Sequence, residues 1–512
     1  MNKKIICLFI CMQFVITAIP TVESLNENEK YSTILEIVEN SSLDDWSEMQ
    51  KLLALDGAGY DNFGVSVSLD GDYALIGADK DDDKGIDSGS AYVFIRNGSF
   101  WDQEAKLLAS DGAPNDYFGY SVSFDEDTAI IGAYGHDDNG DLSGSAYIFT
   151  RTGNIWTQQA KLLASDGAQS DYFGYSVSLS GDTALIGAFR DDDNGYYSGS
   201  AYVFIRNGSF WDQEAKLLAS DGAEWDNFGY RVFLDGDYAL IGAPYDDENG
   251  IQSGSAYVFK RTGTTWAQEA KLLASDGQSY DLFGRSVSLN EDYALIGAYG
   301  DDDNGADSGS AYVFKRTGID WTQERKLLAS DGTPDDYFGF SVSLDGNYAL
   351  IGAYRDDDNG DNSGSAYVFN RTGTIWVQEA KLFATDGALG DYFGCSVSLD
   401  GNYALIGVYS NDENGKDSGS GYVFTKGNLP PNPPTITGPI SGYAGVMYNY
   451  LFSTTDPDGD DVSYWINWGD GTYTGWLGPY PSGHNVSASH SWSNPGFYEV
   501  NATAKDTHGA QS

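Results

Sequence analysis

The sequence predicts an all-β fold, a seven-bladed β-propeller followed by a small β-sandwich. The dipeptide Phe-Gly occurs seven times at intervals of 55 residues, from Phe63 to Phe393, with no insertion or deletion between copies. A tryptophan keeps the same interval from Trp46 to Trp376, as does the run Ser-Gly-Ser-Ala/Gly-Tyr-Val/Ile-Phe that first begins at Ser88. A fixed period of this length indicates an array of one repeated supersecondary unit.

Each unit is expected to form four short antiparallel strands. In the second unit, Gly119–Phe124 alternates small or polar residues with larger ones, and Thr128–Ala133 is an apolar run suited to a strand covered on both faces. Ser143–Phe149 is rich in aromatic and β-branched residues, and Trp156–Ala164 supplies the fourth strand. Four strands per unit, seven units and no helical periodicity predict a propeller rather than a parallel β-helix, whose coils are much shorter.

The two ends of the repeat array predict how the ring closes. The array begins at Trp46 with a fourth strand and ends at Phe424 with a third strand. The leading strand can therefore complete the last blade and leave no unpaired strand edge. We expect Trp46–Leu55 to pair with Ser418–Phe424, in a propeller that spans residues 46–426.

These motifs resemble the FG-GAP repeats of integrin α-subunit propellers and their prokaryotic relatives. The matching residues are Phe63-Gly64, the run Ala74–Ala78 and the strand Gly89–Phe94, and they recur in all seven units. The resemblance implies a propeller that binds or adheres outside the cell. Integrin-type units often bind calcium in an Asp-rich loop between their first and second strands. Here that connection is only Asp70-Gly71-Asp72, so the integrin calcium site is not implied.

The N-terminus resembles a secretory signal. Lys3 and Lys4 precede the mainly apolar stretch Ile5–Ile19, which is shorter than the about 20 residues of a transmembrane helix. We interpret residues 1–25 as a signal peptide and 26–45 as a linker, with a retained N-terminal anchor as the alternative. No later segment is long and apolar enough to span a membrane. The expected location is therefore secreted or at the cell surface.

The C-terminal part is expected to be a second, smaller domain. Residues 427–434 are a Pro-rich linker, and residues 435–512 alternate aromatic and polar residues between turns. The motif Trp468-Gly469-Asp470-Gly471 and the later Gly496–Val500 resemble a PKD domain, an immunoglobulin-like β-sandwich. The sequence stops before the last strand that such domains usually have, so an incomplete sandwich is expected.

The charge balance excludes one class of partner. With 28 Lys and Arg against 76 Asp and Glu, the net charge is −48. Nucleic acids require a basic face, so binding to DNA or RNA is not expected. An acidic surface suits an exported protein that is heavily solvated or collects cations. Only Cys395 lies outside the signal sequence, which precludes an internal disulfide in the mature chain.

Acidic residues recur at four positions of every unit, in the two loops that open on one face. Columns of carboxylates begin at Asp56, Asp61, Asp82 and Asp83 and repeat every 55 residues. Crowded carboxylates repel one another, and Ca²⁺ relieves that repulsion with oxygen ligands. The alternative is that Asp-Gly and Asp-Asn-Gly only form turns with solvated side chains. The candidate calcium ligands are Asp82, Asp83, Asp137, Asp138, Asp192, Asp193, Asp247, Glu248, Asp302, Asp303, Asp357, Asp358, Asp412 and Glu413.

The same loops carry aromatic residues that differ from unit to unit. Aromatic rings mixed with acids at a loop rim suit carbohydrate or protein contacts, although unselected drift at loop tips is the alternative. The candidate ligand-binding residues are Tyr60, Tyr196, Tyr197, Trp225, Tyr245 and Tyr280.

The opposite face is expected to be positive, because the turn between the third and fourth strands carries arginines such as Arg96 and Arg151. Asn97, Asn207 and Asn370 open Asn-x-Ser/Thr sequences there and are candidate glycosylation sites.

Catalysis has little support in the sequence. His136 replaces the Asp or Asn of its column and is expected to be a solvated loop residue, and no Ser/Cys–His constellation or phosphate-binding loop is evident. Sevenfold repetition also argues against an active site, which needs one asymmetric constellation. We therefore expect no enzyme but an extracellular binding or adhesion scaffold for a protein or carbohydrate ligand. The alternatives are a structural surface-coat protein and a secreted polysaccharide-active enzyme.

Overall fold

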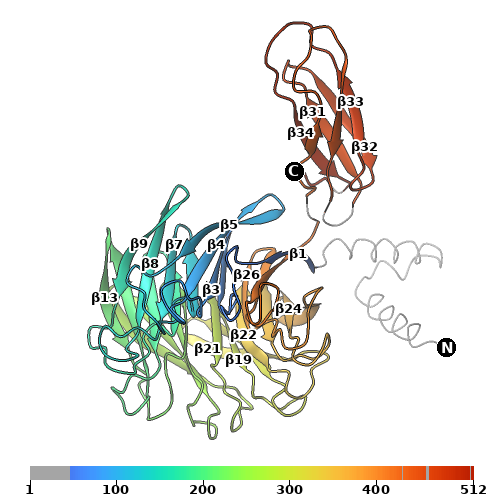
Figure 1. Ribbon diagram of the computed structural model, residues 1–512. Coiled ribbons are helices and arrows are strands. Elements are labelled where there is room, and N and C mark those ends of the chain that lie inside the picture. Colours follow the sequence, from blue (N-terminus) through green and yellow to red (C-terminus); the bar gives the residue numbers. More distant parts are fainter. Residues whose placement is uncertain (1–45, 429, 457–459, 508) are drawn as a thin grey trace, which may run out of the picture.

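The computed structural model describes residues 46–428, 430–456, 460–507 and 509–512 (Figure 1). The expected signal peptide (residues 1–25) and linker (26–45) lie outside the described residues. The described part of the chain contains no helix long and apolar enough to cross a membrane.

Seven four-stranded antiparallel sheets form a ring of blades (Figure 1). The first three blades are β2 (Val67–Asp70), β3 (Tyr73–Ala78), β4 (Ser90–Asn97) and β5 (Phe100–Leu107); β6 (Ser121–Asp125), β7 (Thr128–Ala133), β8 (Ser145–Thr152) and β9 (Ile155–Leu162); and β10 (Ser176–Ser180), β11 (Thr183–Ala188), β12 (Ser200–Asn207) and β13 (Phe210–Leu217). The next three are β14 (Arg231–Asp235), β15 (Tyr238–Ala243), β16 (Ser255–Thr262) and β17 (Thr265–Leu272); β18 (Ser286–Asn290), β19 (Tyr293–Ala298), β20 (Ser310–Thr317) and β21 (Asp320–Leu327); and β22 (Phe338–Asp345), β23 (Tyr348–Ala353), β24 (Ser365–Thr372) and β25 (Ile375–Leu382).

The seventh blade is completed by the first strand of the chain. β26 (Ser396–Asp400), β27 (Tyr403–Val408) and β28 (Ser420–Lys426) are joined by β1 (Trp46–Leu52), in the order β1-β28-β27-β26. Trp46 is paired with Lys426 and Leu52 with Gly421. The expected closure of the ring is confirmed.

The hydrophobic core lies between neighbouring blades. Ala74, Leu75 and Ile76 of β3 are fully buried, as are their counterparts in every blade. Leu75 packs in one cluster with Phe118 and Ile131 of the second blade. The glycine of this strand allows the blades to approach closely, because a Cβ atom on Gly77 would lie 1.9 Å from the carbonyl oxygen of Gly119. The apolar run and the Phe-Gly dipeptide are thus parts of one inter-blade interface.

The first strand of each blade lines the centre of the ring. The Ser68 hydroxyl oxygen accepts a hydrogen bond from the backbone N–H of Phe124 in the next blade, at 3.0 Å. The same contact joins Ser123 to Leu179 at 3.0 Å and is repeated elsewhere around the ring. The alternating serines therefore tie the inner strands together around a central channel.

The repeated tryptophans join the outer strands of neighbouring blades, with one exception. The indole N–H of Trp156 donates to Glu104 of the preceding blade at 2.9 Å, and five other tryptophans make the equivalent bond to Glu or Gln. Trp101 is 2% exposed and its indole nitrogen has no hydrogen-bond partner. The sequence explains the exception, because the position of Glu104 is occupied by Met49 in the unit before Trp101.

We expect Met49→Gln to stabilise the protein by about 1 kcal/mol, because it supplies an acceptor for a buried donor. Chemical denaturation measures the difference in the free energy of unfolding. Gln159→Met is the matched reverse change and should destabilise by a similar amount, since it orphans Trp211. A Met49→Gln protein no more stable than the wild type would contradict this account of the interface.

The C-terminal module consists of two facing three-stranded sheets (Figure 1). Their strands are β29 (Thr435–Thr437), β30 (Tyr448–Ser453), β31 (Val462–Asn467), β32 (Tyr473–Tyr480), β33 (Val486–His490) and β34 (Asn501–Asp506), in the orders β29-β30-β33 and β32-β31-β34. Phe452, Tyr464, Ile466 and Trp468 form the centre of a separate core. The alternation expected from the sequence thus places one face of each sheet inside.

Candidate binding face

The long loops of each blade gather at one end of the ring, away from the C-terminal module (Figure 1). The loop between the second and third strands of one blade contacts the loop that enters the next. The backbone N–H of Asn115 donates to Ile86 O at 2.8 Å, and that of Phe118 donates to Ser88 O at 3.1 Å. These contacts recur around the ring and make the loop face one continuous surface.

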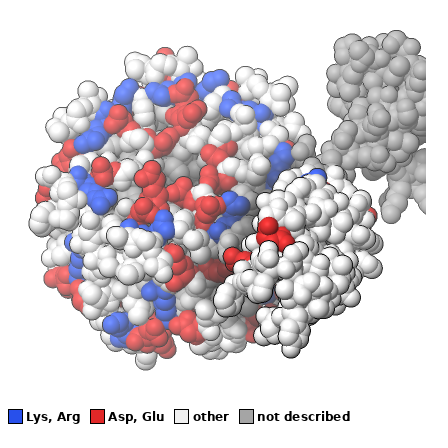
Figure 2. Space-filling view, turned by 90° about the horizontal axis from the view of Figure 1, so that it is seen from above, with Lys and Arg blue, Asp and Glu red and all other residues white. Residues whose placement is uncertain are grey.

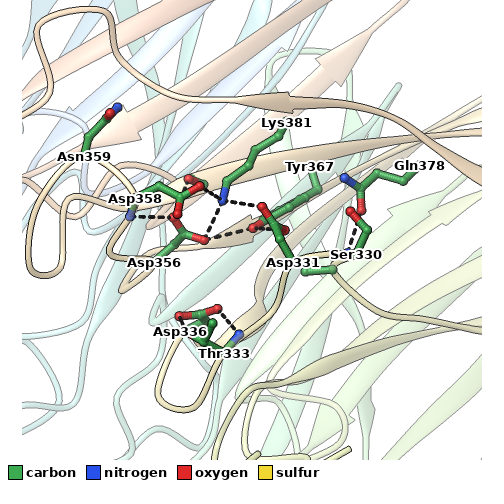
Figure 3. A network of polar contacts seen from close by, with 12 residues as sticks. Ser330, Asp331, Thr333, Asp336, Asp356, Asp358, Asn359, Tyr367, Gln378 and Lys381 are labelled. Atoms are coloured by element: carbon green, nitrogen blue, oxygen red, sulfur yellow. Dashed lines mark hydrogen bonds and ion pairs between the residues drawn. The ribbon is translucent and has the colours of Figure 1, made fainter. Parts of the chain in front are cut away.

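A lysine lies at the centre of the acidic groups in each blade, as the sixth blade shows (Figure 3). Lys381 Nζ lies 2.9 Å from Asp331 Oδ2, 2.9 Å from Asp356 Oδ2 and 2.5 Å from Asp358 Oδ2. The hydroxyl of buried Tyr367 donates to Asp331 and Asp356 at 3.0 and 2.9 Å. The loops and the fourth strand are thereby locked together by one ammonium group.

Sequence reasoning missed these lysines, although they also recur every 55 residues. Each makes an ion pair with two or three carboxylates of its blade. They are Lys51, Lys106, Lys161, Lys216, Lys271, Lys326 and Lys381. A cation with the same period as the acidic columns was the signal that could have revealed the network.

The lysines determine the protonation of the Asp56 column. Burial alone would raise the pKa of Asp331, but the hydrogen bond and charge of Lys381 outweigh it and hold this pKa below its usual value. The other six members of the column behave alike. These carboxylates are charged at neutral pH and engaged within the fold.

The two columns proposed as calcium ligands have different roles. Oδ1 of Asp82 accepts the backbone N–H of Asp87 at 2.8 Å and so shapes its own loop, and its counterparts do the same. Asp83 instead pairs with Lys106 at 2.8 Å. The structure therefore brings the Asp83 column, but not the Asp82 column, to the lysine.

Calcium binding by the loop face, which is expected from the sequence, can be tested by a melting experiment. Because the lysine ammonium already lies among the carboxylates, a Ca²⁺ ion would have to displace it. We expect CaCl₂ and NaCl of equal ionic strength to raise Tm equally, by screening the net charge of −48. A markedly larger shift in CaCl₂ would establish specific calcium sites.

His136 is not the solvated loop residue expected from the sequence, because it is 7% exposed. Its Nε2 lies 3.1 Å from Lys161 Nζ, and ligand atoms of Asp111, His136 and Asp138 lie within 4.8 Å of one another. The neighbouring units explain the burial, since the aspartate of this column is the buried one that contacts the lysine. His136 thus substitutes a ring nitrogen for a carboxylate in a structural network.

The Asp61 column caps the loop that enters each blade. Asp61 Oδ2 accepts the backbone N–H of Ala58 at 2.7 Å, and this contact is repeated in all seven units. Burial, the largest cause, raises the pKa to about 6 for Asp61, Asp171, Asp226 and Asp281. These side chains belong to the fold rather than to an exposed ligand site.

The raised pKa values predict that the protein is more stable at pH 5 than at pH 7. A carboxyl whose pKa is higher in the folded state stabilises it fully below the unfolded value of about 4, and this contribution is lost as pH rises through about 6. The Asp56 column, whose pKa is lowered, loses its contribution only at more acidic pH. We expect on the order of 1 kcal/mol per capping carboxyl between pH 7 and 5. In Asp171→Asn/Asp226→Asn the pH dependence of the unfolding free energy should be shallower; an unchanged slope would refute the assignment.

The predicted ligand-binding residues are only partly brought together. Tyr196 and Tyr197 stack with ring centroids 3.9 Å apart, and Trp225 lies edge-on to both at 4.8 and 5.0 Å. Tyr60 and Tyr280 are exposed at other loop tips. Tyr245 points instead toward the centre of the ring, 6.2 Å from Tyr230. One aromatic cluster thus stands on the rim, between the third and fourth blades.

The opposite face is not the positive surface that the sequence predicted. Arg96 pairs with Asp72, Arg151 with Asp127 and Arg316 with Asp292, all acids from the turn between the first and second strands. Arg261 pairs instead with Glu214, whereas Arg371 donates to the amide oxygen of Asn347. Figure 2 looks onto this end of the ring and shows basic and acidic side chains intermixed. The prediction considered only the arginines in the turns between the third and fourth strands. It omitted the acidic residues that folding brings beside these arginines.

The candidate glycosylation sites lie at this end in two different settings. Asn97 and Asn207 end strands and are exposed. Asn370 lies within β24, and its side-chain amide donates to Glu379 at 2.8 Å. Only the first two correspond to the exposed turns that were expected.

An aromatic cluster at the channel was also missed. The residue after each Phe-Gly points into the centre, and this position varies: Val65, Tyr120, Tyr175, Tyr230, Arg285, Phe340 and Cys395. The Tyr120 hydroxyl donates to Tyr175 at 2.8 Å, and that of Tyr175 donates to Tyr230 at 3.2 Å. We call these seven residues the channel mouth. A cavity of about 190 Å³ is lined by four of them, Val65, Tyr120, Phe340 and Cys395, and mainly by serines and valines of the inner strands.

Comparison with known protein families shows which family this chain belongs to. The family model described as FG-GAP repeat matches residues 46–94, 101–149, 156–204, 211–259, 266–314, 321–369 and 376–424. The chain belongs to the FG-GAP repeat family. No curated protein matches it closely enough to add a more specific relative.

Three solved structures illustrate what the FG-GAP chain is similar to. The PKD domain of an M14-like peptidase from a Thermoplasmatales archaeon is 52% identical over 17% of this chain and 88% of its own, with a TM-score of 0.17. The β-propeller domain of the Trilobed protease from Pyrococcus furiosus is 8% identical over 67% and 90%, with a TM-score of 0.36. The acylaminoacyl peptidase of Pyrococcus horikoshii is 7% identical over 80% and 59%, with a TM-score of 0.40.

The FG-GAP units differ from one another in a restricted set of places. The lysines, their carboxylates and the Phe-Gly dipeptides recur because they close the blades. The loop tips and the channel mouth vary. Much of the chemistry that distinguishes one blade from another therefore lies on the loop face, although the turns between the third and fourth strands also vary.

Proposed function

We propose that this FG-GAP protein is a non-catalytic extracellular binding or adhesion scaffold whose ligand docks on the loop face. The observation that carries the proposal is the rim cluster of Tyr196, Tyr197 and Trp225, in which Trp225 is 55% exposed. Rigid aromatic rings with polar tips supply contact area at little entropic cost, and they are favoured at binding surfaces.

The rest of the chain fits export and display. The C-terminal module is proposed to be a PKD domain that acts as a spacer, as its Trp-Gly-Asp-Gly motif and two facing sheets support. We propose a secreted or cell-surface location, on the basis of the N-terminal residues discussed above. A protein or a carbohydrate is the expected ligand class.

An array of glycans and extracellular proteins tests the proposal. Tyr196→Ala/Trp225→Ala should weaken binding of any ligand found at least tenfold, with little loss of stability because the side chains are exposed. The matched control is Ile155→Ala/Phe210→Ala, which removes somewhat more exposed side chains from the opposite end. Binding that depends on the control pair and not on the rim would place the functional face at the other end. Turnover of a polymer by the protein would replace the scaffold with an enzyme.

A further inference from the structure

Four arginines on the loop face, Arg190, Arg231, Arg285 and Arg355, stack on aromatic rings and have no acidic partner among the described residues. Their guanidinium groups stack on aromatic rings: Arg190 lies 4.3 Å from the Tyr172 centroid, and Arg355 lies 4.6 Å from that of Tyr337. Arg231 and Arg285 lie 5.5 and 4.8 Å from Tyr230. Among the described residues none of the four forms an ion pair, whereas Arg96, Arg151, Arg261 and Arg316 all do.

Arg285 is the most conspicuous of them. Its guanidinium is held between Tyr230 and Phe340, 4.5 Å from the latter ring. Its Nη1 atom is inaccessible to solvent and has no hydrogen-bond partner within the described part of the chain. A charged donor left without a partner in a partly desolvated site costs free energy. The chain has 76 acidic residues, any of which could have been placed to supply a carboxylate partner. The isolation of Arg285 therefore indicates a partner from outside the chain.

Arg231 contacts the same Tyr230 ring and faces the channel. It lines the cavity of about 190 Å³, and its guanidinium donates to the backbone oxygen of Tyr230 at 3.3 Å. Burial would raise the pKa of the Tyr230 hydroxyl, but the two arginines outweigh it and lower this pKa. The centre of the loop face is thus locally positive, while its outer carboxylates are paired with lysines.

The surroundings determine the class of ligand. Arginine binds carboxylates with two parallel hydrogen bonds. The Tyr120–Tyr175–Tyr230 chain adds hydroxyl groups and flat ring faces beside it. The cavity has the volume of about six water molecules, which admits one sugar ring but not a folded protein loop.

We propose that the channel mouth, together with the adjacent Arg231, binds a uronic acid residue, with its carboxylate on Arg285 and Arg231 and its ring against the tyrosines. This proposal makes the proposed function more specific. It rests on the proposed function only because both place the ligand on the loop face. It names an acidic sugar as the ligand class and moves the specific contact from the rim to the centre of the ring.

Isothermal titration calorimetry with D-glucuronate and D-glucose tests the proposal on the whole protein. Glucuronate should bind at least tenfold more tightly than glucose, and Arg285→Gln and Arg231→Gln should each reduce its affinity at least tenfold. Arg206→Gln, which changes a partly exposed arginine at the opposite end, should leave the affinity unchanged. Equal binding of the two sugars, or of glucuronate to wild type and Arg285→Gln, overturns the proposal.

Stability separates a binding role from a structural one. Because Arg285 is unpaired, Arg285→Gln should keep or raise Tm, whereas a structural arginine would lower it. A glutamate-rich peptide that binds in place of glucuronate would overturn the sugar class. Tyr196→Ala/Trp225→Ala should still bind glucuronate. If a ligand found on the array required Tyr196 and Trp225 and the protein did not bind glucuronate, the proposed function would stand and only this inference would be refuted.

Discussion

Lys381→Met is expected to lower the free energy of unfolding by about 3 kcal/mol, because it leaves the carboxylates of Asp331, Asp356 and Asp358 without their counterion. Removing one partner of a buried ion pair costs about 3–5 kcal/mol. The lower figure applies here, since only Asp356 is buried and solvent screens the other two. Denaturant unfolding monitored by tryptophan fluorescence measures the change.

Two further variants identify the cause. Lys416→Met removes an exposed lysine whose one ion pair, with Asp417, spans 3.7 Å, and should change stability by no more than about 0.5 kcal/mol. Lys381→Met/Asp356→Asn should recover part of the loss, because the seventh blade already carries Asn411 at this position. If the double variant were no more stable than Lys381→Met, repulsion between the stranded carboxylates would not be the source of the loss.

Deleting residues 46–55 is expected to cost more than about 6 kcal/mol and to abolish a single cooperative transition. The deletion removes Trp46 and Leu52, and burial of side chains of this kind contributes about 2–5 kcal/mol each. It also removes Lys51 from Asp386 and exposes the backbone edge of β28. An exposed edge recruits other chains, so association that increases with protein concentration should accompany the loss.

Complementation provides the control for this deletion. A synthetic peptide of residues 46–55 should restore the transition and suppress association, by rebuilding the four-stranded seventh blade. The same peptide with Leu52→Asp should not, because it places a charge in the core between the seventh and first blades. A deleted protein that melts like the wild type would show that β1 contributes nothing to closure.

The fold was largely predictable because its signals are local or strictly periodic. Thr128–Ala133 was expected as a strand and is β7, since six successive apolar or small residues leave few alternatives. The third strand was placed at Ser143–Phe149 and lies at Ser145–Thr152, because Arg151 and Thr152 continue the β8–β9 hairpin beyond the apolar run. Polar hairpin ends carry no hydrophobic pattern to mark them.

The candidate site was predictable only as an inventory of residues. The acidic columns and the tips Tyr196 and Trp225 were identified correctly as features of one face. The lysine partners of the acidic columns were not identified, since Lys381 is 25 residues from Asp356 and 50 from Asp331 in the sequence. The burial of His136 and the pairing of Arg96 with an acid were missed for the same reason. Each depends on a neighbour that another strand supplies.

The sequence by itself determined the number of blades, the order of strands within them and the strand that closes the ring, because the 55-residue period and the alternation of apolar residues act along the chain. Tertiary structure alone decided which charges are neutralised, which carboxyls titrate near pH 6 and which arginines are left unpaired at the channel mouth. These properties depend on desolvation and on distances between groups far apart in sequence, and both arise only when the blades pack around one axis.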